Sequence, residues 1–235
     1  MVKLHSNTAI DVQSIFNRIA PTYDSLNQWL SLGQHQIWKT LSVKWCQPKL
    51  NDIALDICCG SGDLTYLLAQ KVGQKGRVYG LDFSTEQLKI AKDKNDSRNF
   101  QNINWIEGNA LNLPFESNTF DCITMGYGLR NLPNIPKSLL EIQRVLKHGS
   151  KSAILDFHRP ESAVISLFQN FYLDYLVVPI ADSYGLREDY AYINKSLQKF
   201  PQGKEQVELG YLAGFSHAVH FPIAEGMMGV LVLTK

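Results

Sequence analysis

The sequence predicts an α/β fold, a Rossmann-like three-layer sandwich in which a mostly parallel β-sheet lies between two layers of helices, with an N-terminal helical cap. Three observations predict it. Residues 10–45 have apolar side chains at helical spacing, short β-like runs alternate with helical runs from residue 53 onward, and two glycines follow the first of those runs. Strands and helices that alternate at this spacing favour a parallel sheet covered on both faces.

The cap is predicted from two apolar faces at helical spacing. These faces are formed by Ile15, Phe16 and Ile19, and by Ile37, Trp38 and Leu41. After the cap, we expect strands over residues 53–57, 77–82, 103–108, 120–125 and 152–157. We expect the intervening helices over residues 62–72, 84–94 and 136–147. The chain then closes with a helix over residues 203–213 and two strands, HAVHFPI and MGVLVLT.

Two helix boundaries carry their own signals. Ser84 followed three residues later by Gln87 is a capping-box pattern, so it marks the start of the helix over residues 84–94. Gly149 follows the helix over residues 136–147, and we expect it to stop that helix. The chain of 235 residues is long enough for one domain with its own core.

Composition excludes several functional classes. The chain is 45% hydrophobic and 19% charged, with a net charge of +1, so it has no overall field that would attract nucleic acid. We find no apolar run of 18 residues and no signal-peptide core at the N-terminus, and we therefore expect no membrane-spanning segment. These features predict a cytoplasmic protein without a nucleic-acid partner.

The four cysteines, at positions 46, 58, 59 and 122, show no paired framework, which fits a reducing compartment. Cys58 and Cys59 are adjacent, and zinc sites usually have two or more residues between such ligands. We expect these side chains to pack as small apolar groups. No metal site is predicted.

The stretch LDICCGSGDL, residues 55–64, predicts a ligand site. Gly60, Ser61 and Gly62 follow the first strand, where glycines let a ligand approach the backbone closely. Asp82 ends the second strand, at the spacing where an acidic residue receives ribose hydroxyl groups. A tight turn with a helix-capping aspartate is the purely structural alternative.

Charge separates two ligand classes for this turn. A dinucleotide presents a pyrophosphate, which Asp56 and Asp63 on either side of the turn would repel, and Thr65 stands where a third glycine is usual. S-adenosylmethionine carries a sulfonium and an ammonium group, both cationic, and carboxylates favour it. We therefore predict S-adenosylmethionine, with NAD as the alternative.

Further positions agree with this cofactor. Asn109 ends the third strand, where its amide could hydrogen-bond the adenine edge, although a turn asparagine is an equal alternative. Ala110, beside it, and Gly126, after the fourth strand, are the other contacts that we expect.

The sequence resembles the class I S-adenosylmethionine-dependent methyltransferases. The matching stretches are LDICCGSGDL, GLDFS, GNALNLPF and RVLKHGS. More specifically, it is similar to the quinone C-methyltransferases of ubiquinone, menaquinone and phylloquinone synthesis. That similarity rests on IFNRIAPTYDSLNQWLSLGQHQIWK, residues 15–39, and GYGLRNLPNIPKSLLEIQRVLK, residues 126–147. It covers nearly the whole chain.

Within that family the phylloquinone branch is most similar, on LDICCGSGDL, GLDFSTEQL, MGYGLRN and SAILDF. The resemblance implies methylation of a ring carbon of a prenylated naphthoquinol, with demethylphylloquinol as the substrate. Demethylmenaquinol and a ubiquinone-pathway benzoquinol are the alternatives within the family. Cys58 departs from a glycine that is common in the wider class, and His158 departs from the family's usual residues.

For this chemistry, position after the fourth strand and side-chain charge indicate Arg130 and Asn131 as catalytic candidates. Arg130 and Asn131 could stabilise a developing quinolate, and a structural ion pair is the alternative for Arg130. His35 is a weaker candidate for a general base, with a structural role as the alternative. Tyr23, with Asp24, could fold over the cofactor as a lid, although Asp24 could equally cap a helix.

The segment over residues 166–184 is rich in apolar and aromatic side chains. It could form a wall for a prenyl tail or contact a membrane surface, and a core or homodimer helix is an equal alternative. We expect one domain, with residues 1–48 as the cap or lid, 49–160 as the cofactor-binding core, and 161–235 as substrate-side helices with a C-terminal strand pair. An NAD-type oxidoreductase and a non-catalytic assembly partner are the alternatives from other functional classes.

Overall fold

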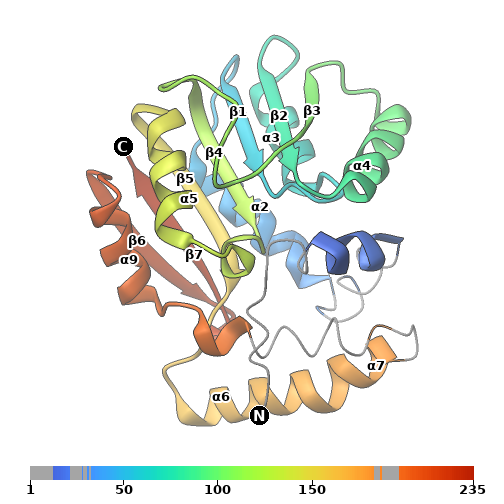
Figure 1. Cartoon of the computed structure of the whole chain (residues 1–235), viewed down its shortest axis with the longest axis vertical. Coiled ribbons are helices and arrows are strands. Elements are labelled where there is room, and N and C mark those ends of the chain that lie inside the picture. The colour runs from blue at the N-terminus through green and yellow to red at the C-terminus, as the bar shows by residue number, and fades with distance from the viewer. Residues whose placement is uncertain (1–12, 22–27, 29–30, 32, 183–185, 187–195) are drawn as a thin grey trace, which may run out of the picture.

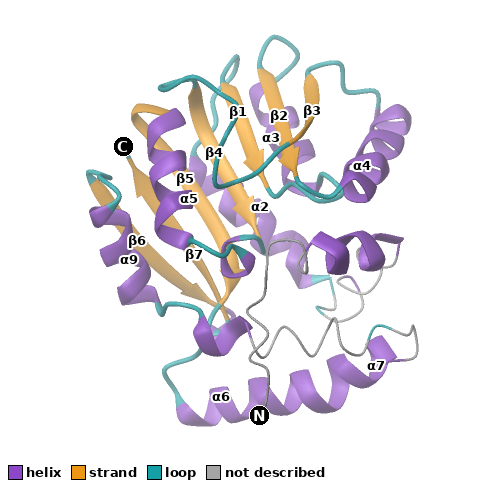
Figure 2. Ribbon diagram, in the orientation of Figure 1, coloured by secondary structure: helices purple, strands orange, loops and turns teal. Residues whose placement is uncertain are grey.

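The computed structural model describes residues 13–21, 28, 31, 33–182, 186 and 196–235. Tyr23 and Asp24, two of the predicted lid residues, lie outside these ranges. The seven strands form one sheet in the order β3-β2-β1-β4-β5-β7-β6 (Figures 1 and 2). The strands are β1 (Ile53–Ile57), β2 (Arg77–Asp82), β3 (Ile103–Glu107), β4 (Phe120–Gly126), β5 (Leu146–Phe157), β6 (His217–Ile223) and β7 (Met228–Thr234).

Helices cover both faces of this sheet. The α-helices are α2 (Gln34–Cys46), α3 (Asp63–Val72), α4 (Thr85–Arg98), α5 (Ile135–Val145), α6 (Ala163–Tyr172), α7 (Val178–Asp182) and α9 (Gly203–Leu212). The shorter elements are η1 (Leu129–Asn131), the π-helical η2 (Leu173–Val177) and η3 (Ala224–Gly226). Residues 13–21 are also helical.

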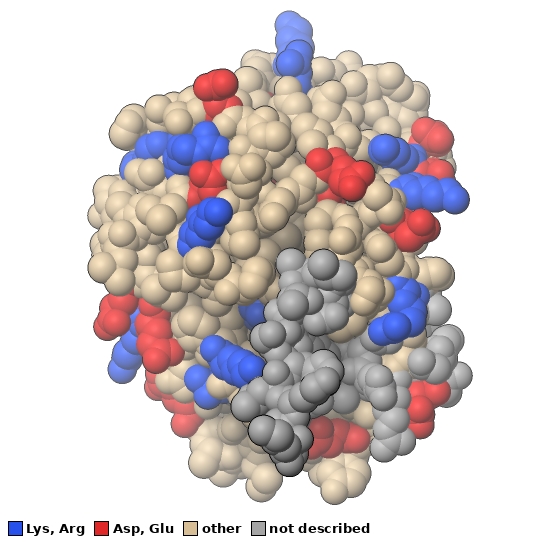
Figure 3. All heavy atoms as spheres, in the orientation of Figure 1, with Lys and Arg blue, Asp and Glu red and all other residues tan. Residues whose placement is uncertain are grey.

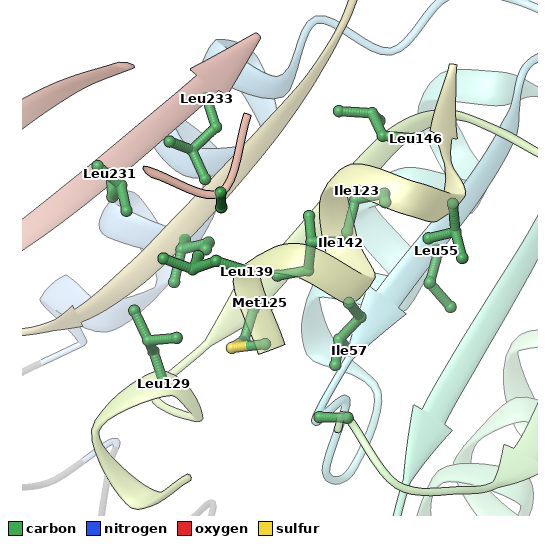
Figure 4. Close-up of a cluster of buried hydrophobic side chains, with 14 of the residues drawn as sticks. Leu55, Ile57, Ile123, Met125, Leu129, Leu139, Ile142, Leu146, Leu231 and Leu233 are labelled. Carbon is green, nitrogen blue, oxygen red and sulfur yellow. The ribbon is translucent and has the colours of Figure 1, made fainter. Parts of the chain in front are cut away.

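The alternation of side chains along each strand builds two cores. Leu55 and Ile57 of β1 pack with α5 and α9 on one face, whereas Ala54 packs with α2 and α3 on the other. Figure 4 shows the first core, where Leu139 and Ile142 of α5 lie over the strands. A strand buried on both faces is typical of a parallel sheet between helix layers. The predicted α/β sandwich is confirmed.

The order of the strands reverses at β1. Strand β1 pairs in parallel with β2 on one side and with β4 on the other, and β5 continues the parallel part beside β4. Strand β7 then pairs antiparallel with β5, and β6 pairs antiparallel with β7. In open α/β sheets, ligands bind beyond the carboxyl ends of the strands at such a reversal.

One predicted boundary is wrong. Helix α5 ends at Val145, and Leu146 is already extended and paired with Phe120 of β4. Gly149, expected to stop the helix, lies inside β5 with a φ of 75°. Its N–H donates to the carbonyl of Lys235 at 2.8 Å. The glycine therefore permits an irregularity in β5, where the β4–β5 register shifts, rather than a helix end.

Among the described residues, one helix has the length and composition of a membrane span, which we did not expect from the sequence. Residues Ala163–Ile180, which run through α6, η2 and the start of α7, form an 18-residue helix with a mean hydropathy of 1.4. Only 17% of this helix is buried. Ser166, Gln169 and Asn170 interrupt the apolar run in the sequence, which hid its length. By length and composition the helix could cross a membrane, but helices that lie along a membrane surface reach such lengths too.

Candidate active site

A cavity of about 540 Å³ opens at the carboxyl ends of β1, β2 and β4. In Figure 1 these ends point toward the dark-blue helix over residues 13–21. Four segments of the core contribute to the wall, namely 56–64, 81–87, 107–111 and 126–133. Gln13, Phe16 and Lys39 contribute from the N-terminal helices. The site thus lies at the reversal of strand order, where the fold predicts it.

Both glycines of the turn adopt left-handed backbone conformations. Gly60 has a φ of 53° and Gly62 a φ of 92°. A Cβ at Gly62 would lie 2.6 Å from the Trp105 ring, so no side chain fits there. The N–H of Gly60 donates to Asp82 Oδ2 at 2.8 Å, which ties the turn to the end of β2. Ser61, between the two glycines, lines the cavity.

Asp56 lies in the cavity wall and is fully buried. Its carboxylate accepts hydrogen bonds from Thr65 Oγ1 at 2.7 Å and Thr124 Oγ1 at 2.9 Å. Burial raises the pKa of Asp56 to about 7, although both hydroxyl groups act to lower it. Near neutral pH this carboxyl group is therefore balanced between its neutral and ionised forms.

Asp63 has a compensating cation. Lys39 Nζ lies 2.6 Å from Asp63 Oδ2, and the Lys39 residue is 7% exposed. Burial acts to raise the pKa of Asp63, but the charge and hydrogen bond of Lys39, with Lys94, hold that pKa below its usual value. The two negative charges expected on either side of the turn therefore differ: Asp63 forms an ion pair with Lys39, and burial raises the pKa of Asp56.

Asp82 lies at the end of β2 and is buried in the cavity wall. Burial raises the pKa of Asp82, although the backbone N–H groups of Ser84, Gly60 and Phe83 oppose that shift. Helix 13–21 closes over this end of the cavity. Gln13 Nε2 donates to the Phe83 carbonyl at 2.6 Å, and Ser84 Oγ donates to Asn17 Oδ1 at 2.6 Å.

Asn109, Ala110 and Gly126 all line the cavity. Asn109 Oδ1 accepts from the N–H of Leu111 at 2.8 Å, as a turn asparagine does. A Cβ at Gly126 would lie 2.8 Å from Leu64 Cδ1, which explains the glycine there. Every described residue that was predicted to bind the cofactor thus lines the cavity except Gly62, which shapes the turn beside it.

Residues 127–131 form a braced loop at the end of β4. Tyr127 has a φ of 59°, and its carbonyl accepts from Arg130 Nη1 at 3.1 Å and Asn131 Nδ2 at 2.9 Å. Arg130 Nη1 also pairs with Asp156 Oδ1 at 2.6 Å, and both side chains are buried. Arg130 is absent from the residues that line the cavity, whereas Asn131 lines it. Of the two predicted catalytic residues, only Asn131 therefore lines the cavity, whereas Arg130 forms a structural ion pair with Asp156.

His35 does not reach the cavity wall among the described residues. Its Nδ1 lies 2.7 Å from Ser31 Oγ, and its Nε2 lies 2.9 Å from Gln36 Nε2. Both ring nitrogens are thus occupied on a residue that is 4% exposed. This geometry fits the structural alternative better than a general base.

Lys39 and Gln87 are two of the polar cavity residues that were not predicted as site residues. Lys39 follows the HQIW stretch of the N-terminal signature, so the signature itself held the only signal for it. The sequence predicts Gln87 only as a capping residue, yet both polar atoms of its amide are buried in the cavity wall and have no hydrogen-bond partner in the described part of the chain.

These residues fit S-adenosylmethionine. The cavity combines the carboxyl groups of Asp56 and Asp82 with the Gln87 amide, which has no partner among the described residues, and with apolar side chains such as Phe16 and Phe83. A cofactor with an aromatic base, a ribose and a cationic end needs that combination.

Comparison with solved structures identifies the fold class. An S-adenosylmethionine-dependent methyltransferase from Aquifex aeolicus matches 89% of this chain and 96% of its own, with a TM-score of 0.62 at 19% identity. A Haloferax volcanii putative methyltransferase complexed with the activator Trm112 matches 93% of this chain and 96% of its own, with a TM-score of 0.67 at 17% identity. At these identities the likeness shows the fold alone, which is the class I methyltransferase fold.

Sequence comparison is more specific. The model of the ubiE/COQ5 methyltransferase family matches residues 1–235, so the chain belongs to that family. A Nostoc punctiforme protein named 2-phytyl-1,4-naphtoquinone methyltransferase is 58% identical over 96% of this chain and 98% of its own. An Arabidopsis thaliana protein named 2-phytyl-1,4-beta-naphthoquinone methyltransferase, chloroplastic, is 48% identical over 94% of this chain and 86% of its own.

The protein is therefore a methyltransferase, and S-adenosylmethionine is its methyl donor. The family predicted from the sequence is confirmed. The NAD-type oxidoreductase alternative is excluded.

Proposed function

We propose that this enzyme methylates a ring carbon of a prenylated naphthoquinol, with demethylphylloquinol as its substrate. The observation that carries the proposal is the 56–58% identity, over 95–96% of the chain, to relatives from Nostoc punctiforme, Trichormus variabilis and a further Nostoc strain that share one name. That name specifies a phytyl naphthoquinone methyltransferase. Demethylmenaquinol and a benzoquinol of the ubiquinone pathway are the competing substrates.

The cofactor and the protein have separate roles in the methyl transfer. Bound S-adenosylmethionine supplies an electrophilic methyl group. The ring carbon of a quinol becomes more nucleophilic as its O–H bond weakens, so the protein has to align the ring, exclude water and hold that proton. Alignment is worth up to about 7–11 kcal/mol in favourable cases.

Asn131 is our candidate for holding the quinol O–H. Its Nδ2 is committed to the Tyr127 carbonyl, and its Oδ1 is buried without a partner in the part of the chain that the structure describes. The free atom is an acceptor, so it suits a hydroxyl donor rather than a quinolate anion. This refines the expectation that both Arg130 and Asn131 would donate to the quinolate.

We assign positioning roles to Arg130 and His35. The backbone N–H of Arg130 donates to Asp156 Oδ2 at 3.0 Å, and its guanidinium braces the Tyr127 carbonyl. Both contacts fix the loop that presents Asn131. His35 lies on α2 one turn before Lys39, and its charge helps lower the pKa of Asp63. We keep Tyr23 as a proposed lid residue on the family resemblance alone.

We further propose that the enzyme works in the cytoplasm at the surface of the membrane that holds the quinone pool. Phe168, Phe171 and Tyr175 are 56%, 58% and 70% exposed on the helix over residues 163–180. In Figure 1 this helix forms the lower edge of the molecule, away from β1–β3. A substrate with a long apolar tail resides in the membrane, and a helix whose apolar side is exposed can lie on that surface.

A panel of quinols tests the substrate. The protein is incubated with S-adenosylmethionine labelled in its methyl group and with phytyl naphthoquinol, prenylated menaquinol precursors and benzoquinols, each also supplied in the oxidised form. We expect label in the phytyl naphthoquinol product, with less or none in the benzoquinols. Label on a benzoquinol alone would overturn the substrate and leave the family intact, and no label on any quinol would favour the non-catalytic alternative.

A further inference from the structure

Gln87 has a buried amide that forms no hydrogen bond with any residue that the structure describes. It lies in the first turn of α4 and is 1% exposed. Its side chain lines the cavity, yet neither Nε2 nor Oε1 has a hydrogen-bond partner among the described residues. Buried amides are almost always paired, so an unpaired amide in the wall of a ligand cavity requires an explanation.

The capping-box pattern at Ser84 does not explain why the Gln87 amide is unpaired among the described residues. In a complete capping box, the side chain at the position of Gln87 would accept from the backbone N–H of Ser84. Here that N–H donates to Asp82 Oδ1 at 2.9 Å instead. Ser84 Oγ still accepts from the N–H of Gln87 at 3.2 Å, so only half of the box forms. Because Asp82 accepts the hydrogen bond from the Ser84 N–H, the Gln87 amide does not take part in capping this helix.

The Gln87 amide and the Asp82 carboxylate lie near the same glycine of the turn. A Cβ on Gly60 would lie 3.7 Å from Gln87 Oε1, and the N–H of the same Gly60 donates to Asp82 Oδ2. Both side chains therefore flank one glycine of the turn. An ionised carboxylate only accepts hydrogen bonds, whereas an amide both donates and accepts.

Together the two groups match the chemistry of a vicinal diol. Each hydroxyl of a diol donates one hydrogen bond and accepts others, so it can donate to Asp82 while it accepts from Gln87 Nε2. We infer that Gln87 is a cofactor-binding residue that forms, with Asp82, the site for the ribose diol of S-adenosylmethionine. This inference rests on the methyltransferase function and adds a residue that its sequence pattern explained as a helix cap.

Calorimetry with two ligands tests the inference. The ligands are S-adenosylhomocysteine and its analogue without the two ribose hydroxyl groups, and the variant is Gln87→Met, which keeps length and removes the amide. We expect Gln87→Met to raise the Kd for S-adenosylhomocysteine about 10-fold and to leave the Kd for the deoxygenated analogue unchanged.

A second readout needs no ligand. Since Gln87→Met removes an unpaired buried amide, we expect it to raise the Tm of the ligand-free protein. Gln206→Met is the matched control: Gln206 is also buried, but its Nε2 donates to the Pro201 carbonyl at 2.8 Å. The control should lower the Tm and leave the Kd values for both ligands unchanged.

Three outcomes would overturn the inference. If Gln87→Met raised the Kd for both ligands by the same factor, or changed neither Kd, the amide would not recognise the diol. Gln87→Met that lowers the ligand-free Tm or fails to fold would show that the amide already has a partner. Wild-type protein that binds neither ligand would overturn the methyltransferase assignment together with this inference, whereas the first two outcomes would leave that assignment standing.

Discussion

Asp56 and Asp63 flank one glycine turn, yet their carboxyl groups have opposite surroundings. Asp56 is buried among hydroxyl groups, and burial raises its pKa to about 7. Asp63 is paired with Lys39, and its pKa lies below the usual value. The charge next to the cofactor therefore depends on which of the two acids is ionised, a distinction that the spacing of the residues does not contain.

We predict that Asp56→Asn stabilises the protein at high pH. The pKa of Asp56 is about 7 in the folded chain against an ordinary 3.8, so the folded state holds a proton that the unfolded state has released. Wild-type stability therefore falls as the pH rises through that window. Urea unfolding should give the variant a higher free energy of unfolding at about pH 8, by up to about 4 kcal/mol, and a smaller difference at about pH 5.

Asp63→Asn serves as a control of opposite sign. Because the folded pKa of Asp63 is lowered, its ion pair contributes stability above the unfolded pKa and loses it as the pH falls through the folded pKa. This control should be less stable than wild type at about pH 8. If Asp56→Asn were instead less stable than wild type at that pH, the raised pKa would be contradicted.

Lys39 and Gln87 show which site residues the sequence alone does not predict. Lys39 meets Asp63 across 24 positions of sequence, and only the packing of α2 beside α3 brings them together. Gln87 carries a local capping signal, but Asp82 competes for the same backbone N–H. By contrast, Gly60, Gly62 and Asp82 were predictable because the strand ends on which they lie are fixed by local apolar patterns.

The same contrast holds for whole elements. The strands were predicted to within a residue or two except at the start of β5, because short apolar runs between turns identify buried strands. The end of α5 was predicted too late in the sequence. A glycine that permits an irregularity in a strand cannot be distinguished, by sequence alone, from a glycine that stops a helix. The apolar segment over residues 166–184 was predicted, but polar residues interrupt it, so the sequence did not indicate one apolar helix of 18 residues over residues 163–180.

The helix over residues 163–180 carries a prediction at this scale. Leu167, Phe171 and Tyr175 are 72%, 58% and 70% exposed on it. We predict that replacing all three with Ser lowers binding to phosphatidylglycerol vesicles at least about 10-fold, since each apolar side chain gains about 1.5–3 kcal/mol on full burial. Vesicle flotation measures the binding, and Leu212→Ser, at a residue 81% exposed on α9, is the matched control.

The exposed apolar side chains of that helix could instead pack against a second copy of the chain. Analytical ultracentrifugation of the wild type and the triple variant distinguishes a homodimer contact from a membrane contact. If wild type is a dimer, the triple variant is a monomer, and vesicle binding is equal for both, the exposed apolar side chains form a homodimer contact instead of a membrane contact.

At the scale of the molecule, the reversal of strand order at β1 places the site. The seven strands form one sheet, and the loops after β1, β2, β3 and β4 meet at one cavity. We propose that the chain folds as a single domain around this sheet. On the face shown in Figure 3, acidic and basic side chains are interspersed, in line with a net charge of +1.

We predict that the ligand stabilises the whole molecule. A ligand that binds only the folded state at 100 times its Kd adds about 2.7 kcal/mol, which corresponds to a rise in Tm of roughly 5–10 °C for a chain of this size. Differential scanning calorimetry should show this rise with S-adenosylhomocysteine in a single transition and no rise with NADH. A rise with NADH alone would contradict the electrostatics assigned to the glycine turn.

The most direct test of the proposed function is the position of the transferred methyl group. The enzyme is incubated with S-adenosylmethionine carrying a ¹³C-methyl group and with reduced demethylphylloquinone, and the product is analysed by ¹³C NMR. We predict a single new resonance from a methyl group bonded to a carbon of the naphthoquinol ring. A methyl group bonded to a quinol oxygen would contradict the account.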